Sequence, residues 1–216
     1  MRRFGVIGFL AACTLLVSAV AFAGEPRLEQ KRLRPADMAL AKRTTLRAAD
    51  LGRGWTRRQP DRSAGQLPTC PGVDVDFSMF TITGTAQSAF AAGIANVQSH
   101  VEVFESRSDA SRDFRKATSA PVLRCVGRWL RDEAAKASPG ARVISSRLLS
   151  RPRLGERGIL YRVVMEVPID TGRLRVFVDI VAFQRGRTSV ALVFSSAYAP
   201  ARGELGVARK VVARAR

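Results

Sequence analysis

The sequence predicts an α+β domain in which an antiparallel sheet is covered by helices on one face and held by one disulfide bond. Strand-like segments, with apolar residues at every second position, fall into two groups at 76–105 and 142–194, and these predict two antiparallel meanders. Between the groups, residues 106–139 carry apolar residues at helical spacing. Strands and helices in separate runs are typical of the α+β class.

The N-terminus has the pattern of a secretory signal peptide. Arg2 and Arg3 precede an uncharged apolar run over 4–20, and small residues at Ala21 and Ala23 mark a cleavage site. Residues 1–23 are therefore expected to be removed, leaving a secreted, extracytoplasmic protein of the cell envelope.

Two alternatives for this segment stay open. It could remain as an uncleaved membrane anchor, although the apolar run is about as short as a membrane span can be. Leu10-Ala11-Ala12-Cys13 also resembles a lipobox, in which Cys13 would become a lipidated N-terminus. No later apolar run is long enough to span a bilayer, so the rest of the chain is expected to meet a membrane only by peripheral contact.

The remaining chain reads as a spacer followed by one domain. Residues 24–35 are charged and contain two prolines, which predicts a flexible linker. A single α+β domain is expected over 36–216, opening with a helix at 36–47. Glycines on both sides of Arg53 predict a turn that brings Trp55 into a core.

Two cysteines are left once the signal peptide has been removed. Cys70 ends a loop rich in Pro, Gly and Ser, and Cys125 is expected on the inward face of a helix. In an oxidising compartment an even pair predicts a disulfide bond, which would stabilise the fold by about 4 kcal/mol in the chain-entropy model. Two cysteines and the single His100 are too few ligands for a metal site.

The other elements follow from periodicity and turn residues. Ser106 and Asp109 resemble a helix capping box, and Pro121 is expected to open a second helix. Glycines at 84 and 93 are expected to be turns. The expected strands are 76–83, 85–91, 96–105, 142–149, 158–168, 174–182 and 188–194, and a terminal helix is expected over 201–215.

The chain is strongly basic, with 36 Lys and Arg against 18 Asp and Glu and a net charge of +18. An extracytoplasmic protein of this charge favours acidic partners such as anionic envelope polymers or lipid headgroups. Solvation alone is the simpler explanation of the same charge. Nucleic acid is not expected as a partner, because aromatic and basic residues are not interleaved.

Several loose motifs point to a known family. They are Leu-x-x-x-Asp-Leu-Gly-x-Gly-Trp at 46–55, Val-x-Val-Phe-x-Ser-x-x-x-Ala at 101–110 and Asp-x-Val-x-x-x-Arg-Gly at 179–186. Over residues 44–213 the chain resembles the extracellular sensor-like domains of actinobacterial lipoproteins and of kinase-H-like receptor kinases. The resemblance implies an α+β fold with a ligand-binding cleft. The chain departs from the receptor form, since it has no kinase part and cysteines for one disulfide where the resemblance implies two.

No catalytic constellation stands out in the sequence. His100 and Glu102 share one face of a strand, which is compatible with a general base or a pH-sensitive pair but also with an ordinary cross-strand pair. There is no Gly-x-Ser-x-Gly motif and no phosphate-binding glycine loop. Asp74 and Asp76 are too few ligands for a hard cation. We therefore expect neither an enzyme nor a cofactor.

The function that this sequence favours is a non-enzymatic binding or sensor-like module. The expected cleft opens beside inward-facing aromatic residues, with Trp55 and Trp129 as walls and Arg128 or Arg162 as the anchor for an acidic group. Phe114 and Phe194 are the other inward aromatics. The alternative is a basic surface protein that adheres to anionic envelope polymers or lipid headgroups, and the sequence does not identify a ligand.

Overall fold

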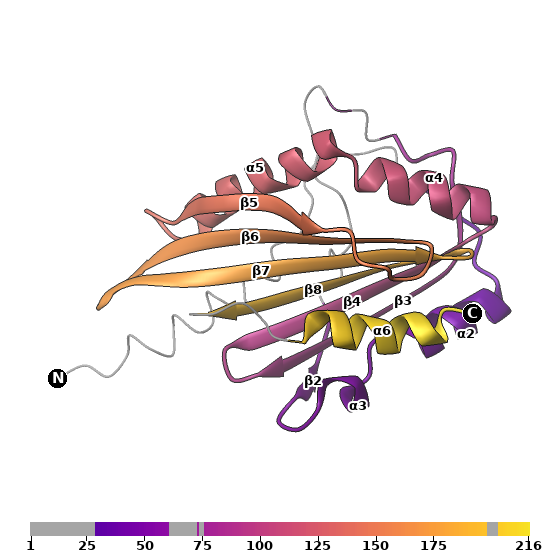
Figure 1. Cartoon of the computed structure of the whole chain (residues 1–216), viewed down its shortest axis with the longest axis horizontal. Helices are drawn as coiled ribbons and strands as arrows, with labels where there is room; N and C mark the ends of the chain where they lie inside the picture. The colour runs from indigo at the N-terminus through magenta and orange to yellow at the C-terminus, as the bar shows by residue number, and fades with distance from the viewer. Residues whose placement is uncertain (1–28, 61–72, 74–75, 198–202) are drawn as a thin grey trace.

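One eight-stranded sheet runs through the molecule (Figure 1). This computed structural model describes residues 29–60, 73, 76–197 and 203–216. The strand order is β1-β3-β4-β8-β7-β6-β5, and β2 also pairs with β3. All pairs are antiparallel except β1 with β3. The strands are β1 (Gln30–Lys31), β2 (Thr56–Arg58), β3 (Thr81–Ala92), β4 (Ala95–Phe104), β5 (Arg142–Ser150), β6 (Arg157–Ile169), β7 (Gly172–Arg185) and β8 (Thr188–Ala197).

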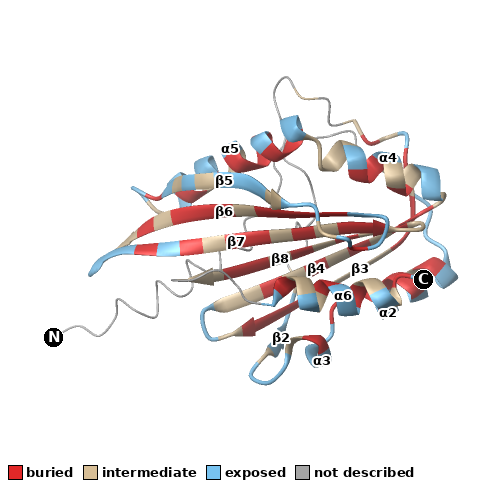
Figure 2. Cartoon of the chain, viewed as in Figure 1, coloured by how far each residue is buried: buried red, intermediate tan, exposed pale blue. Residues whose placement is uncertain are grey.

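Helices lie on both faces of this sheet, so the prediction of helices on one face is wrong. The helices are α2 (Pro35–Thr44), α3 (Ala48–Leu51), α4 (Arg107–Ala117), α5 (Ala120–Ala137) and α6 (Glu204–Arg214). Val181 and Phe183 of β7 pack in one core with α2 and α6. Val176 and Val178, which point to the other face of the same strand, pack with α4 and α5. Figure 2 shows buried segments along the central strands between these two helical layers.

The two predicted groups of strands join into one continuous sheet. β4 pairs with β8, so that Val101 lies opposite Val190. Only β5 to β8 run in meander order, and β3 and β4 form a hairpin at the other side. The early and late halves of the chain therefore share a core, in which Val97, Val101, Leu192 and Phe194 are buried together.

Only one of the two cysteines of the predicted disulfide bond lies in the described residues. Cys125 is buried in α5, whereas Cys70 falls in the stretch 61–72, which the structure does not describe. The predicted Cys70–Cys125 bond therefore lies outside the part of the chain that the structure describes, and the fold class is corrected to a mixed α and β fold with helices on both faces of the sheet. The described core is apolar packing on both sides of the sheet.

Local signals set the boundaries of the α4–α5 pair. The Ser106 hydroxyl accepts a hydrogen bond from the Asp109 main-chain N–H at 2.9 Å, which confirms the predicted cap of α4. Pro121 lies in the first turn of α5, where its missing N–H costs nothing. Gly140, with φ of 83°, follows the end of α5.

The start of the domain differs from the expected spacer. Gln30 and Lys31 form β1, and the main-chain N–H groups of Arg32 and Arg34 donate to the carbonyls of Ile82 and Thr83. The main-chain N–H groups of this charged, Pro-containing segment are satisfied by the edge of the sheet at β3. Composition alone does not reveal that such an edge is available. In the described part of the chain, no helix has the length and apolar character needed to cross a bilayer.

Gly84 is not a turn but an interior residue of β3, where the strand pairing shifts by one residue. A Cβ at this position would collide with the main-chain carbonyl of Asp37 and lie 2.8 Å from the nitrogen of Met38. The absence of a side chain therefore lets the first turn of α2 rest directly on the strand.

We expect Gly84→Ala to lower the free energy of unfolding by about 1 to 3 kcal/mol, because the new methyl group must push α2 away from β3. Urea denaturation measures this change. Gly206→Ala in α6 is the matched control, since a Cβ there meets nothing within 4 Å and an alanine favours the helix. If Gly84→Ala lowered the free energy of unfolding no more than the control does, the close approach of α2 to β3 would be refuted.

Candidate functional site

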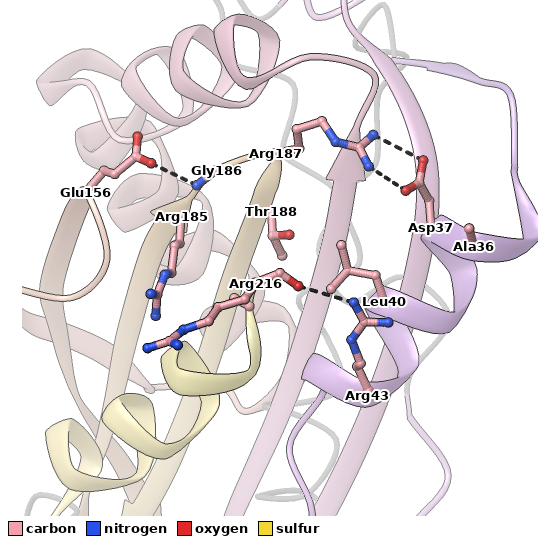
Figure 3. Close-up of a pocket in the computed structure, with 11 residues that line it drawn as sticks. Ala36, Asp37, Leu40, Arg43, Glu156, Arg185, Gly186, Arg187, Thr188 and Arg216 are labelled. Carbon is pink, nitrogen blue, oxygen red and sulfur yellow. Dashed lines mark hydrogen bonds and ion pairs between the residues drawn. The ribbon is translucent and has the colours of Figure 1, made fainter.

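A pocket of about 550 Å³ opens at one end of the sheet, where the β7–β8 turn meets α2 and the end of α6 (Figure 3). Gly186 has a φ of 57°, so glycine suits this tight turn between β7 and β8. The pocket is lined by Ala36, Asp37, Leu40, Arg43, Glu156, Arg185, Gly186, Arg187, Thr188, Ala215 and Arg216.

One wall of the pocket is an ion pair between α2 and the turn. The Arg187 guanidinium donates to both carboxylate oxygens of Asp37, at 2.7 and 3.2 Å, and to the Phe104 carbonyl at 3.0 Å. The hydrogen bonds from Arg187 hold the pKa of Asp37 below its usual range. Both charges are therefore committed to each other, and the pair ties α2 to the β7–β8 turn.

The second acidic residue of the pocket fastens the turn itself. Glu156 accepts hydrogen bonds from the Gly186 main-chain N–H at 2.9 Å, from Gln184 at 3.2 Å and from Arg107 at 3.1 Å. The bond from Gly186 is the main reason why the pKa of Glu156 lies below its usual value. This carboxylate, like Asp37, is already neutralised by protein donors.

The other three arginines of the pocket pair with no side-chain carboxylate among the described residues. Arg43 donates to the main-chain oxygen of Arg216 at 3.2 Å, and Arg185 donates to the Val212 carbonyl at 3.0 Å, near the C-terminal end of α6. Figure 3 shows Arg185 and Arg216 extending toward the same side of the pocket. The site therefore carries excess positive charge, beside a small apolar surface from Leu40 and Ala215.

The structure does not bring together the residues expected to form a cleft. Trp55 packs against the core between the sheet and α2 and α6, whereas Trp129 packs against the core on the other face. Arg128 is exposed on α5, and the remaining predicted anchor, Arg162, lies on the face opposite α5. The inward aromatics Phe114 and Phe194 are both buried, in different cores.

Arg162 is bound within the protein. Its guanidinium donates to both oxygens of Asp179, at 2.5 and 2.9 Å, and lies 3.6 Å from Glu204 and 6.0 Å from the centre of the Phe177 ring. The bonds to Asp179 raise the pKa of Arg162 further. An anchor for an external acid would have to break this pair.

His100 lies in a polar cluster beneath α4. Its Nε2 is 2.9 Å from Glu102 and its Nδ1 is 2.9 Å from the Gln87 amide. Burial lowers the pKa of His100, but the neighbouring Glu102 outweighs it and raises the pKa overall. Burial also raises the pKa of Asp113 in α4 well above its usual value.

Asp76, which with Asp74 was judged too small a set of ligands for a cation, has partners within its own segment. Asp76 accepts hydrogen bonds from both the main-chain N–H and the hydroxyl of Ser78, at 2.9 and 2.6 Å, as in a local turn. Asp74 falls outside the part of the chain that the structure describes. Across the described ranges, no group of three His, Cys, Asp or Glu side chains is placed to hold a metal ion.

The arginines of the pocket were missed by sequence reasoning. The one local signal is Arg185-Gly186-Arg187, in which a hairpin glycine is flanked by two cations. Arg43 and Arg216 come from distant segments, and only the folded chain places them beside this turn. No protein-family model and no curated protein matches the chain, so the site rests on its geometry alone.

Proposed function

We propose that the protein is a non-enzymatic binding module of the cell envelope whose pocket takes a small anionic ligand. The observation that carries this proposal is the set of three arginines at the pocket, Arg43, Arg185 and Arg216, which no described side-chain carboxylate neutralises. Guanidinium groups bind phosphate and carboxylate through paired hydrogen bonds, which makes a ligand with such a group the best match.

The form of the pocket supports a small ligand. Its volume of about 550 Å³ falls in the range of small-molecule sites, and its lining combines cations with a few apolar side chains. The Asp37–Arg187 pair and the Glu156 bonds fix the walls before any ligand arrives, so little ordering is needed on binding. Location outside the cytoplasm follows from the signal-peptide pattern at residues 1–23.

Calorimetric titration with inorganic phosphate and pyrophosphate tests this proposal. We expect Arg185→Ala and Arg43→Ala each to weaken binding by about tenfold or more, because a hydrogen bond to a charged group contributes about 1.5 to 3 kcal/mol. Arg209→Ala is the charge-matched control, since Arg209 is exposed on α6 and does not line the pocket. Melting temperatures of all variants separate lost binding from lost fold.

Two results would overturn the proposal. The first is that the wild-type protein binds neither anion at millimolar concentration. The second is that the pocket variants bind as tightly as Arg209→Ala.

A further inference from the structure

Helix α5 presents a stripe of three arginines away from the sheet. Arg124, Arg128 and Arg131 are spaced four and three residues apart, which places them on one helix face, and all three are exposed. The opposite face of α5 is buried through Val122, Val126, Leu130 and Ala134. The packing of the helix therefore fixes the direction in which the arginine stripe points.

The helix that carries the arginine stripe is held closely to the sheet. A Cβ at Gly127 would run into the Ser146 side chain, so this glycine allows α5 to approach β5. The Tyr161 hydroxyl donates to the Leu123 carbonyl at 2.8 Å and also contacts the Ser146 hydroxyl. The stripe is thus preorganised, which reduces the entropy that a partner must overcome.

The charge of the stripe is not cancelled within the described structure. No described carboxylate forms an ion pair with Arg124, Arg128 or Arg131. Of the two acids in α5, Glu133 is bonded to Lys136 at 2.8 Å, and Asp132, four residues after Arg128, forms no ion pair with it in the described structure. Helix α4, which precedes α5 along the same side of the sheet in Figure 1, adds the exposed Arg115.

We propose that the arginine stripe, continued by Arg115, binds a linear polymer that carries phosphate groups along its length. With a rise of about 1.5 Å per residue, Arg124 and Arg131 lie about 10 Å apart along the helix axis, a distance over which such a polymer presents successive charges. Guanidinium groups suit phosphate oxygens better than ammonium groups do.

A lipid surface fits this side of the molecule less well. The exposed large apolar side chains of the described residues are Leu33, Met79, Ile94, Ile144 and Leu148, and none of them lies on α4 or α5. The two helices themselves would therefore hold a membrane by charge alone, without side chains that insert between lipids. The stripe also lies on the opposite face of the sheet from the pocket, so this proposal is independent of the pocket ligand.

Binding of long-chain polyphosphate, measured by calorimetry at several salt concentrations, tests the proposal. We expect the triple variant Arg124→Gln, Arg128→Gln and Arg131→Gln to bind at least tenfold more weakly. The plot of log affinity against log salt should lose about 2 in slope, since each cation–phosphate contact to a single strand contributes about 0.7. The control variant Arg53→Gln, Arg57→Gln and Arg58→Gln loses the same charge at exposed positions near β2 and should bind within threefold of wild type.

Three further measurements decide between the explanations. Single variants at Arg124 and Arg131, which are the least able to disturb the fold, should each lower the slope by about 0.7. The pocket variant Arg185→Ala should keep its polyphosphate affinity within threefold. The proposal would be overturned if the two triple variants bound polyphosphate equally tightly. It would also be overturned if the triple variant at Arg124, Arg128 and Arg131 lost binding to phosphatidylglycerol vesicles but kept its affinity for polyphosphate.

Discussion

Replacement of Asp179 by alanine is expected to lower the free energy of unfolding by about 3 to 5 kcal/mol, because it leaves the largely buried Arg162 without its carboxylate. Asp179 is only 1% exposed and accepts two hydrogen bonds from that guanidinium. The remaining acid near Arg162, Glu204, lies 3.6 Å away and cannot replace a two-point contact. Urea denaturation at neutral pH measures the loss.

Two further variants test whether the loss of stability comes from the unpaired charge of Arg162. Glu133→Ala removes the exposed pair with Lys136 and should leave the midpoint nearly unchanged. The double variant Arg162→Met and Asp179→Leu should recover much of the stability that the single variant loses, since no charge is then left unpaired. If Asp179→Ala proved as mild as Glu133→Ala, the pair would contribute little and Arg162 would again be a candidate anchor for a ligand.

The second large effect concerns pH and the start of the domain. Burial, reinforced by the nearby Glu102, raises the pKa of Glu29 to about 7, against a usual value of 4.5. Lys31 and His100 also face this carboxyl and act in the opposite direction. Between pH 4.5 and 7 the unfolded chain releases this proton while the folded chain keeps it. The free energy of unfolding therefore falls as pH rises through this window, by up to about 3 kcal/mol.

The variant Glu29→Gln isolates this contribution. At pH 4.5 it should be about as stable as wild type, and at pH 8 it should be more stable by up to about 3 kcal/mol. Glu105→Gln is the control, because Glu105 is half-buried and paired with Arg34, so its loss should bring no gain at pH 8. Parallel pH profiles of Glu29→Gln and wild type would show that Glu29 is solvated in the folded protein.

Local signals predicted individual elements well, whereas the layering was mispredicted. The Ser106 cap and the alternation from Val97 to Val103 depend on neighbouring residues and were correctly interpreted. The helices at 36–47 and 201–215 were predicted, but their position on a second face of the sheet was missed because only one face of β7 was taken as apolar. Phe177, Val181 and Phe183 on its other face carry the signal that the strand is buried on both sides.

The candidate site could not be predicted, because its contacts join distant parts of the chain. Asp37 and Arg187 are separated by 150 positions, and no local pattern marks them as partners. The tryptophans were expected to be walls of one cleft because both were predicted to face inward, but they pack against separate cores on opposite faces of the sheet. Gly84 was expected to be a turn because the reason for its small size, the main chain of α2, lies far away in the sequence.

The pocket lies between the first and last helices of the domain. A ligand can therefore bind there only when both helices are in their native positions. Thr44 of α2 donates to the main-chain oxygen of Arg214, and Arg214 donates to both oxygens of Asp50. Contacts between residues this far apart in sequence carry a loop-closure cost, which slows the folding of chains that are rich in them. A ligand that binds only the finished pocket therefore stabilises the native state by mass action, so that thermal denaturation can detect it. An exported chain would acquire this binding capacity only when its C-terminal helix has docked beside its N-terminal one.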